Sequence, residues 1–309
     1  MGLDLLIVVI YFAVIITVAL SGRSSNENTS SEAFFLSSRS LRWPSIAIST
    51  VATNVNGYQF LGMMGSAYLF GLAQANLEIN AVLGLWMAAF IFVPLYLKSR
   101  VITITQFIKE KLGASVALAY TSANIILFST LGLGGALFWG AYAADLVFGE
   151  MLSLLHPDPF TRVSILIIFL GVFSAIYTYF GGLTAVVRTD VIQFVILFLG
   201  GTVVLFTAVH HLGGWGELYR QKPELMHLHL PADHPKLPWI GIFGMILLNI
   251  NYWGANQTVL QRSLAARSLK DAQMGLMVGG ILKYLMTFLI IVPGIALAGI
   301  LIQNPLSDP

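Results

Sequence analysis

Long apolar runs alternate with short polar segments along the whole chain. A helix crosses the hydrocarbon core of a membrane with about 20 apolar residues. By this measure the chain contains eight candidate spans, at residues 3–21, 44–70, 76–97, 115–148, 162–182, 187–210, 239–261 and 274–302. The fourth run is too long for one upright helix, so we expect it to tilt or to extend out of the bilayer. The pattern predicts an all-α polytopic membrane protein with a single transmembrane domain over residues 1–309.

The first run, residues 3–21, has neither a basic segment before it nor a small-residue cleavage site after it. We therefore interpret it as a retained span. An uncleaved signal anchor is the alternative, and it predicts the same membrane location. Most loops are short. The exceptions are residues 22–43, which are rich in Ser and Asn, and residues 211–238, an expected external loop that carries most of the histidines.

Composition supports the membrane class. The 309 residues are 57% hydrophobic and only 10% charged, and the mean hydropathy is +0.82. A soluble domain this apolar would lack a polar surface. The net charge of +2 is too small, and too dispersed between spans, to indicate a nucleic-acid partner. The absence of cysteine excludes disulfides and thiol chemistry. No nucleophile–base or metal motif is present, so we expect neither an enzyme nor a cofactor.

The distribution of Lys and Arg predicts the orientation. With the N-terminus outside, the inner loops hold eleven basic residues: Arg23, Arg39, Arg42, Lys98, Arg100, Lys109, Lys111, Arg188, Arg262, Arg267 and Lys270. The outer loops then hold four: Arg162, Arg220, Lys222 and Lys236. Because basic residues concentrate on the cytoplasmic side, the prediction is a multi-pass protein of the cell (plasma or inner) membrane with its N-terminus outside.

Polar residues interrupt the second span. Asn54, Asn56 and Gln59 surround Gly57 within residues 53–60. We expect the helix to unwind here, which a membrane tolerates only where the backbone lines an enclosed cavity. Freed carbonyls and half-helix ends suit a small cation and a polar solute.

A second polar group lies in the seventh span. Asn249, Tyr252, Trp253 and Asn256 occur at i, i+3, i+4 and i+7, which places them on one helix face. Gly254 interrupts that face where the backbone breaks most easily. Because a buried amide without a partner costs several kcal/mol, this face indicates a binding site at membrane depth.

Three charged residues lie in or beside spans. Glu78 suits either a solute contact or a helix N-terminus at the interface, where the macrodipole favours an acid. Lys283 is too far from the nearest inner loop to snorkel, so we favour a paired or ligand-facing lysine. Asp190 has two equal interpretations: a local salt bridge with Arg188, or a position on a cation exit path.

Three segments carry a family resemblance. Residues 181–193, GGLTAVVRTDVIQ, resemble the signature of the sodium:solute symporter family. Residues 52–63 resemble the unwound first core helix of that family. Residues 251–268 are similar to its sodium/glucose and sodium/galactose branch. The segments follow the family's order along the chain.

The resemblance implies a LeuT-like inverted-repeat fold, in which an extra helix precedes two inverted sets of five core helices. The chain matches the extra N-terminal helix and core helices one to seven. Core helix eight, which completes the family's sodium site, and core helix ten are not matched. The resemblance therefore implies an incomplete fold and a missing C-terminal half as a possible partner.

The resemblance also assigns roles to individual residues. Four positions match solute contacts: Gln59, Glu78, Asn249 and Lys283. Three match gate positions: Tyr252, which stacks on the sugar, Asn256, which supports it, and Met63 on the outer side. Sodium is held partly by backbone carbonyls that match Ala52 and Val55, and Asp190 matches an aspartate of the cation pathway. Ala81 and Leu77 depart from the galactose-binding pattern, which leaves the sugar open.

The expected function is therefore sodium-coupled symport of a glucose- or galactose-like sugar across the bilayer by alternating access. Amides, an acid–base pair and an aromatic ring also fit hydroxyls and an apolar sugar face. One alternative keeps sodium-coupled symport but changes the solute to an amino acid, sialic acid, myo-inositol or another organic molecule. The other is a truncated, non-transporting fragment that needs a C-terminal partner.

Overall fold

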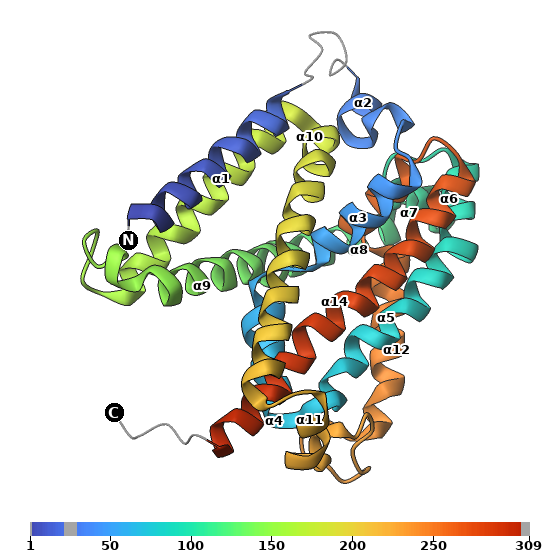
Figure 1. The fold of residues 1–309 in the computed structure, drawn as a ribbon. Coiled ribbons are helices and arrows are strands. Elements are labelled where there is room, and N and C mark those ends of the chain that lie inside the picture. Colours follow the sequence, from blue (N-terminus) through green and yellow to red (C-terminus); the bar gives the residue numbers. More distant parts are fainter. Residues whose placement is uncertain (1, 22–29, 304–309) are drawn as a thin grey trace.

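The computed structural model describes residues 2–21 and 30–303, and this part of the chain is almost entirely helical (Figure 1). It contains no β-strand, only isolated bridges joining Leu41 to Ala266 and Leu230 to Pro238. The longer helices are α1 (Gly2–Leu20), α3 (Trp43–Asn54), α5 (Asn76–Met87), α8 (Ala114–Leu127), α9 (Gly135–Leu152), α10 (Pro159–Leu212), α12 (Ile242–Ala255) and α14 (Leu269–Gln303). Shorter ones are α2 (Ser31–Leu36), α4 (Met64–Phe70), α6 (Val93–Ser99), α7 (Ile104–Leu112), α11 (Trp215–Gln221) and α13 (Gln257–Leu264).

Short 3-10 or π-helical segments connect many of these helices. They are η2 (Ser37–Arg39), η3 (Gln59–Met63), η4 (Gly71–Ala75), η5 (Ala88–Phe92), η6 (Phe128–Gly134), η7 (Pro223–Met226) and η8 (Trp239–Gly241). The predicted external loop, residues 211–238, thus contains α11 and η7.

Five helical stretches of the described residues are long and apolar enough to cross a membrane: Leu3–Leu20, Gln59–Ser99, Ala114–Leu152, Pro159–Leu212 and Leu269–Gln303. A sixth apolar stretch, Trp239–Ala255, is shorter. Each of the eight predicted segments is mainly helical, with non-helical breaks at Val55 and Asn56 in the second and at Asn256 in the seventh. The difference in number arises where neighbouring segments join. Residues 162–182 and 187–210, for example, both lie within α10.

A glycine bends α10 between those two segments. Gly182 has φ +55° and ψ −156°, a conformation that a side chain disfavours. A Cβ atom at this position would also lie 2.7 Å from the carbonyl oxygen of Phe34. In Figure 1 the first part of α10 runs beside α1, and the part after the bend descends past α14. Glycine is therefore required both for the turn and for the close approach of the chain around Phe34.

The start of α10 is fixed by a side-chain cap. Asp158 Oδ2 accepts hydrogen bonds from Thr161 Oγ1 at 2.7 Å and from Thr161 N at 2.8 Å. These bonds lower the pKa of the Asp158 carboxyl below its usual range. Pro159 follows at the first helical position, where its missing N–H is not needed.

The predicted break in the second span is present between α3 and η3. Val55 leaves the helix with φ −91° and ψ 121°. Side chains replace the lost helical bonds: Asn56 Oδ1 accepts from Tyr58 N at 2.8 Å, and Gln59 Nε2 donates to Asn54 O at 2.9 Å. Amides that bond nearby backbone compete with the helix, which explains why it opens here.

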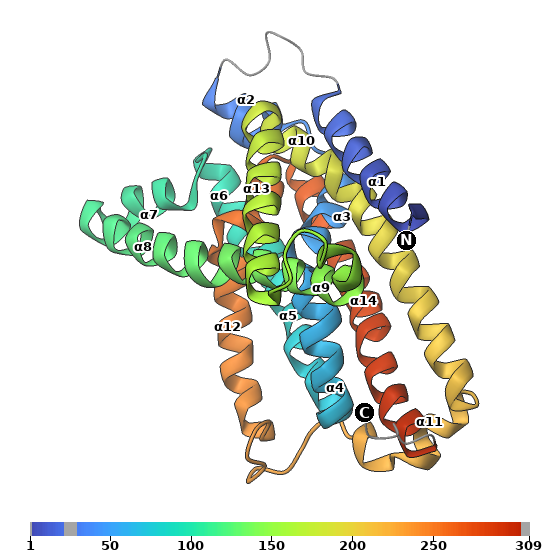
Figure 2. The ribbon, with the colours of Figure 1, turned by 90° about the vertical axis from the view of Figure 1, so that its left-hand side faces the viewer.

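Helices α3, α5, α12 and α14 pack together, and α10 lies against α3 and α14 (Figure 2). Trp253 lies in the apolar core and is 1% exposed. Large apolar side chains such as Leu131, Phe160 and Tyr179 point outward on α8–α10. These outer surfaces suit contact with lipid.

Candidate functional site

A buried ion pair links α14 to α5. Lys283 Nζ contacts the carboxylate of Glu78, and the two residues are 3% and 7% exposed. The Lys283 ammonium also lies 5.2 Å from the ring centre of Trp253, within cation–π range. Of the two roles expected for Lys283, paired or ligand-facing, the structure shows the pairing, and the contact with a solute stays a prediction. Isolated charges at this depth would be strongly disfavoured, so each residue makes the burial of the other possible.

Asn54 connects this pair to the aromatic ring of Tyr252. Its Oδ1 accepts a hydrogen bond from Lys283 Nζ, and its Nδ2 donates to Tyr252 Oη at 3.2 Å. The sequence assigned Asn54 only to the helix break and gave it no contact with the other site residues. Its contacts depend on α14 and α12, which are distant in sequence, so no local signal pointed to them.

Gln59 holds the break itself. In addition to the bond from Nε2 to Asn54 O, its Oε1 accepts from Asn56 N at 2.9 Å. The residue is 7% exposed, so its amide is both buried and satisfied. Gln59 lies beside Asn54 in the structure, but its hydrogen bonds go to the unwound backbone.

Asn249 lies on the inward face of α12. Its Nδ2 donates to Leu77 O at 3.1 Å and to Met245 O at 3.0 Å, and its Oδ1 accepts from Trp253 Nε1 at 3.2 Å. The bond to Leu77 O ties α12 to α5, and the other two lie within α12. The bond from Trp253 also orients its ring beneath the Lys283 ammonium.

A cavity of about 800 Å³ lies beside this network. Its polar and aromatic lining includes Asn54, Gln59, Tyr252, Asn256 and Trp139. The remaining lining comes largely from the apolar segment of α8, η6 and α9. A volume of this size, with few polar groups among apolar ones, is typical of small-molecule sites.

The ion pair is separate from the cavity wall. Glu78, Lys283 and Asn249 are not among the lining residues, and Asn54 and Tyr252 connect them to it. The structure thus brings the four predicted solute contacts and Tyr252 into one network but exposes only part of that network to the cavity.

Asn256 retains a free donor at the cavity. Its Oδ1 accepts from Thr258 N at 2.8 Å and so caps α13. Its Nδ2 has no hydrogen-bond partner in the described part of the chain, although the residue is only 4% exposed. A buried donor without a partner is costly, so the Asn256 amide is a polar group that the packing of the described residues leaves unsatisfied.

The remaining predicted positions lie in or near an apolar cluster. Met63 is fully buried in η3, and Ala52 and Val55 are each 8% exposed at the end of α3. Carbonyls in the last turn of a helix lose their intrahelical donors, which leaves them able to bind a cation. The roles of Met63 as a gate and of Ala52 and Val55 as sodium ligands stay predictions.

Asp190 belongs to a second buried polar cluster. It accepts a hydrogen bond from Ser49 Oγ, and Arg262 Nη2 lies 3.4 Å from its Oδ2. Arg262 Nε also donates to Ser49 Oγ at 3.0 Å. Arg262 is 5% exposed, so it is buried on α13 and does not lie in a solvated loop as we expected.

The local salt bridge between Asp190 and Arg188 was the wrong pairing. Arg188 instead donates to the carbonyl oxygen of Ser21. Two residues apart on a helix, Arg188 and Asp190 point to different sides, so a more distant arginine takes the partner position.

The family can now be assigned. A sequence model of the sodium:solute symporter family matches residues 34–305. The chain belongs to this family. The resemblance seen in three short segments is therefore confirmed over most of the sequence, and the family and its relatives are transporters rather than enzymes. Together with the apolar helices, this membership makes the chain a multi-pass membrane protein.

Sodium/glucose cotransporters of the family are clear relatives. The chain is 32% identical to the "Sodium/glucose cotransporter" of Vibrio parahaemolyticus over 95% of its own length and 55% of the relative. It is also 32% identical to "Sodium/glucose cotransporter 4" of Mus musculus, over 94% of its own length and 44% of the relative. The chain thus spans about half the length of these curated relatives.

A solved structure supports the fold. A Na⁺-coupled sialic acid symporter in a substrate-bound outward-open state superposes with a TM-score of 0.81 and 20% identity. The match covers 97% of this chain and 61% of that one. At this identity the likeness shows the fold alone, and the predicted LeuT-like fold is confirmed for the portion that the chain spans.

Proposed function

We propose that the chain forms part of a transporter that couples sodium entry to the uptake of a sugar by alternating access. The observation that carries the proposal is the Lys283–Glu78 pair, joined through Asn54 to Tyr252 at the cavity wall. An acid, a base, amides and an aromatic ring are thereby held in one network. Such a set suits a neutral solute with several hydroxyl groups and one apolar face.

The charge balance of the pair supports a neutral solute. Glu78 and Lys283 neutralise each other when no solute is present, so neither is left as a buried lone charge. A sugar hydroxyl both donates and accepts hydrogen bonds, so it can join this pair without adding charge. The names of the curated relatives point to the same solute class.

Sodium coupling is supported by the helix break and by the Asp190 cluster. The break leaves Ala52 and Val55 at a helix end, and Asp190 supplies a buried carboxylate among the hydroxyls of Ser49 and Thr53. Oxygen donors of these kinds suit a small hard cation. Ala52, Val55 and Asp190 are the sodium-handling positions of this proposal.

The placement in the cell membrane with the N-terminus outside also remains a proposal, supported by the excess of basic residues in the predicted inner loops. The chain covers about half of each curated relative, so the proposal includes further helices as partners for transport.

The test is uptake of labelled glucose and galactose into liposomes that contain the chain, with an inward gradient of sodium or of potassium. Faster uptake with sodium supports the proposal. If uptake is equal with either ion, both for the chain alone and together with the remaining part of a relative, the proposal fails.

Competition within the same assay identifies the solute class. Unlabelled sugars, myo-inositol, an amino acid and sialic acid are compared at matched concentrations. If sialic acid or the amino acid competes at lower concentration than every sugar, the sugar assignment is wrong while sodium-coupled symport still stands.

A further inference from the structure

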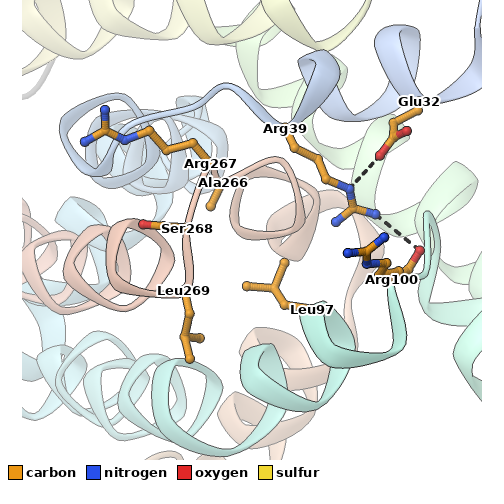
Figure 3. Close-up of a pocket in the computed structure, with 8 residues that line it drawn as sticks. All are labelled: Glu32, Arg39, Leu97, Arg100, Ala266, Arg267, Ser268 and Leu269. Carbon is orange, nitrogen blue, oxygen red and sulfur yellow. Dashed lines mark hydrogen bonds and ion pairs between the residues drawn. The ribbon is translucent and has the colours of Figure 1, made fainter.

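A second pocket lies at the end of the bundle where α2, the α6–α7 turn and the α13–α14 turn meet (Figure 3). Its volume is about 450 Å³. The lining residues are Glu32, Arg39, Leu97, Arg100, Ala266, Arg267, Ser268 and Leu269. None of them belongs to the network around Lys283, so the pocket is separate from the proposed transport site.

The walls of this pocket are fixed to one another by backbone hydrogen bonds. Leu41 N donates to Ala265 O and Arg267 N donates to Leu41 O, each at 3.0 Å. The Arg39 guanidinium adds bonds to Leu264 O at 3.2 Å, to Arg100 O at 3.3 Å and to Val101 O at 3.2 Å. Three segments distant in sequence are therefore held as one preformed site.

Two arginines share the pocket. Figure 3 shows Arg39 and Arg100 joined by a hydrogen bond from the Arg39 guanidinium to the Arg100 backbone carbonyl, and the Glu32 carboxylate lies 2.6 Å from Arg39 Nε. Arg267 points away from them and pairs with Asp271 at 2.7 Å. The charges that face the pocket are therefore two arginines and one glutamate, an excess of one positive charge. Glu32 offsets the charge of Arg39, so the net positive charge at this pocket attracts an anion.

Both arginines occupy an unfavourable backbone conformation. Arg39 has φ +50° and Arg100 has φ +52°, and the other non-glycine residues with positive φ among those described are the neighbouring Ser37 and Ser38. Arg100 ends α6 at a position where glycine or asparagine is usual. Backbone strain of this kind, kept by the surrounding structure, is often found at ligand sites.

We infer that this pocket binds a phosphate group through the Arg100 guanidinium, while Arg39, whose donors are bonded within the protein, contributes positive charge from the pocket wall. Guanidinium groups bind phosphate oxygens through paired, charge-assisted hydrogen bonds. The start of α14 at Leu269 adds the positive end of a 35-residue helix to the same wall, although Asp271 in its first turn offsets part of that charge.

The phosphate is carried by a phospholipid head group or by a small soluble ester. The volume accommodates a phosphate with a glycerol-sized substituent. Leu97 and Leu269 provide apolar lining, and Leu269 is 43% exposed, which suits the glycerol and first methylenes of a lipid. The two sources share one recognition chemistry and are separated by experiment.

The experiment measures binding to the full chain in phosphatidylcholine nanodiscs. One arm adds phosphatidylglycerol to the bilayer and follows its retention by native mass spectrometry. The other adds glycerol 3-phosphate to the solution and follows binding by calorimetry. Retention of phosphatidylglycerol alone supports the head group as the source, and binding in the second arm supports a soluble ester. If the chain binds neither probe, the inference is wrong.

Matched variants separate a built site from general attraction to a basic surface. Arg100→Gln removes a pocket guanidinium, and Lys98→Gln removes the same charge from an exposed residue of α6 outside the pocket. We expect Arg100→Gln to weaken binding about tenfold or more, since charge-assisted bonds to phosphate are lost. Lys98→Gln should leave the affinity nearly unchanged. Equal loss in the two variants contradicts the inference.

The unfolding temperature tests the alternative interpretation that Arg100 only stabilises the end of α6. In that case Arg100→Gln lowers the unfolding temperature with no change in phosphate affinity, and the inference fails. Arg100→Lys should bind with intermediate affinity, because it keeps the charge but cannot form paired bonds.

Discussion

Arg262 on α13 and Asp190 on α10 are 72 residues apart in sequence, yet Arg262 Nη2 lies 3.4 Å from Asp190 Oδ2. Both residues are nearly inaccessible to solvent, at 5% and 6% exposed. Ser49 bonds to both and so connects α3 to the pair. The second half of α10 is thereby tied to the two helices that flank the breaks at Val55 and Asn256.

Replacing Arg262 with Gln should therefore destabilise the protein strongly. Asp190 would be left as a buried carboxylate without its cation, a loss of about 3–5 kcal/mol. Lys270→Gln is the control, because it removes the same charge from an exposed residue of the next helix. Denaturant unfolding in detergent measures both. An equal and small effect in the two variants would show that the Asp190 pair does not stabilise the fold.

The Lys283–Glu78 pair predicts non-additive effects of mutation. Glu78→Gln or Lys283→Met alone should cost about 3–5 kcal/mol, because the surviving charge stays buried and unpaired. The double variant should cost less than the sum of the two single variants. The interaction free energy follows from the unfolding free energies of the unchanged protein, the two single variants and the double variant.

A surface pair with an exposed arginine provides the comparison for that cycle. Arg220 lies 3.2 Å from Glu217 and its side chain is 80% exposed. Arg220→Gln should change stability by less than about 1 kcal/mol. If the losses in unfolding free energy of the Glu78 and Lys283 variants simply add in the double variant, the two residues are not coupled.

Gly182→Ala should destabilise the bend in α10. The positive φ with ψ −156° is a conformation that almost only glycine adopts, so it costs an alanine about 1–3 kcal/mol. The new Cβ would also press against Phe34 O. Gly200→Ala in the same helix is the matched control, since a Cβ there meets nothing within 4 Å. It should raise stability by about 0.5–1 kcal/mol. Thermal unfolding compares them, and a neutral Gly182→Ala would mean that the bend does not depend on glycine.

Asn54→Ala tests the connection between the ion pair and the cavity. Lys283 loses an acceptor and Tyr252 loses a donor, so we expect the solute concentration for half-maximal uptake to rise about tenfold. Asn124→Ala is the control: it loses one hydrogen bond within α8, to Tyr120 O, and does not line the cavity. If both variants transport like the unchanged chain, Asn54 has no part in solute binding.

Tyr252→Phe separates the ring from its hydroxyl. The ring and its contact with Trp253 remain, and only the bond from Asn54 is lost. We therefore expect a smaller rise in the half-maximal concentration than for Asn54→Ala. Tyr252→Ala, which removes the ring as well, should have the largest effect of the three in the same uptake assay. If Tyr252→Phe raised the half-maximal concentration more than Tyr252→Ala did, the ring would not be a solute contact.

Much of the fold was predictable from local pattern. Long apolar runs predicted the helices because backbone hydrogen bonds must be satisfied within each segment in a membrane. The helix break at residues 53–60 was predictable for a related reason, since the amides of Asn56 and Gln59 compete for the backbone locally. Both features depend on neighbours in sequence, which the pattern displays directly.

The partners of the charged residues were only partly predictable. The sequence indicated that Lys283 needed a partner or a ligand, and Glu78 was one of few acids available at that depth. For Asp190 it offered Arg188, and the structure selected Arg262 instead. The role of Asn54 as a connector and the phosphate pocket at Arg39 and Arg100 had no local signal, because each depends on segments that meet only after packing.

The sequence by itself therefore determined the membrane class, the family, the helical segments and the set of polar residues that lipid cannot accommodate. Apolar length and the cost of an unpaired polar group at membrane depth are enough to reveal these. Tertiary structure decided which polar groups pair with each other in hydrogen bonds and ion pairs. A hydrogen bond or ion pair requires atoms within a few ångströms, and residues separated by many positions in the chain reach that distance only when α3, α5, α10, α13 and α14 pack together.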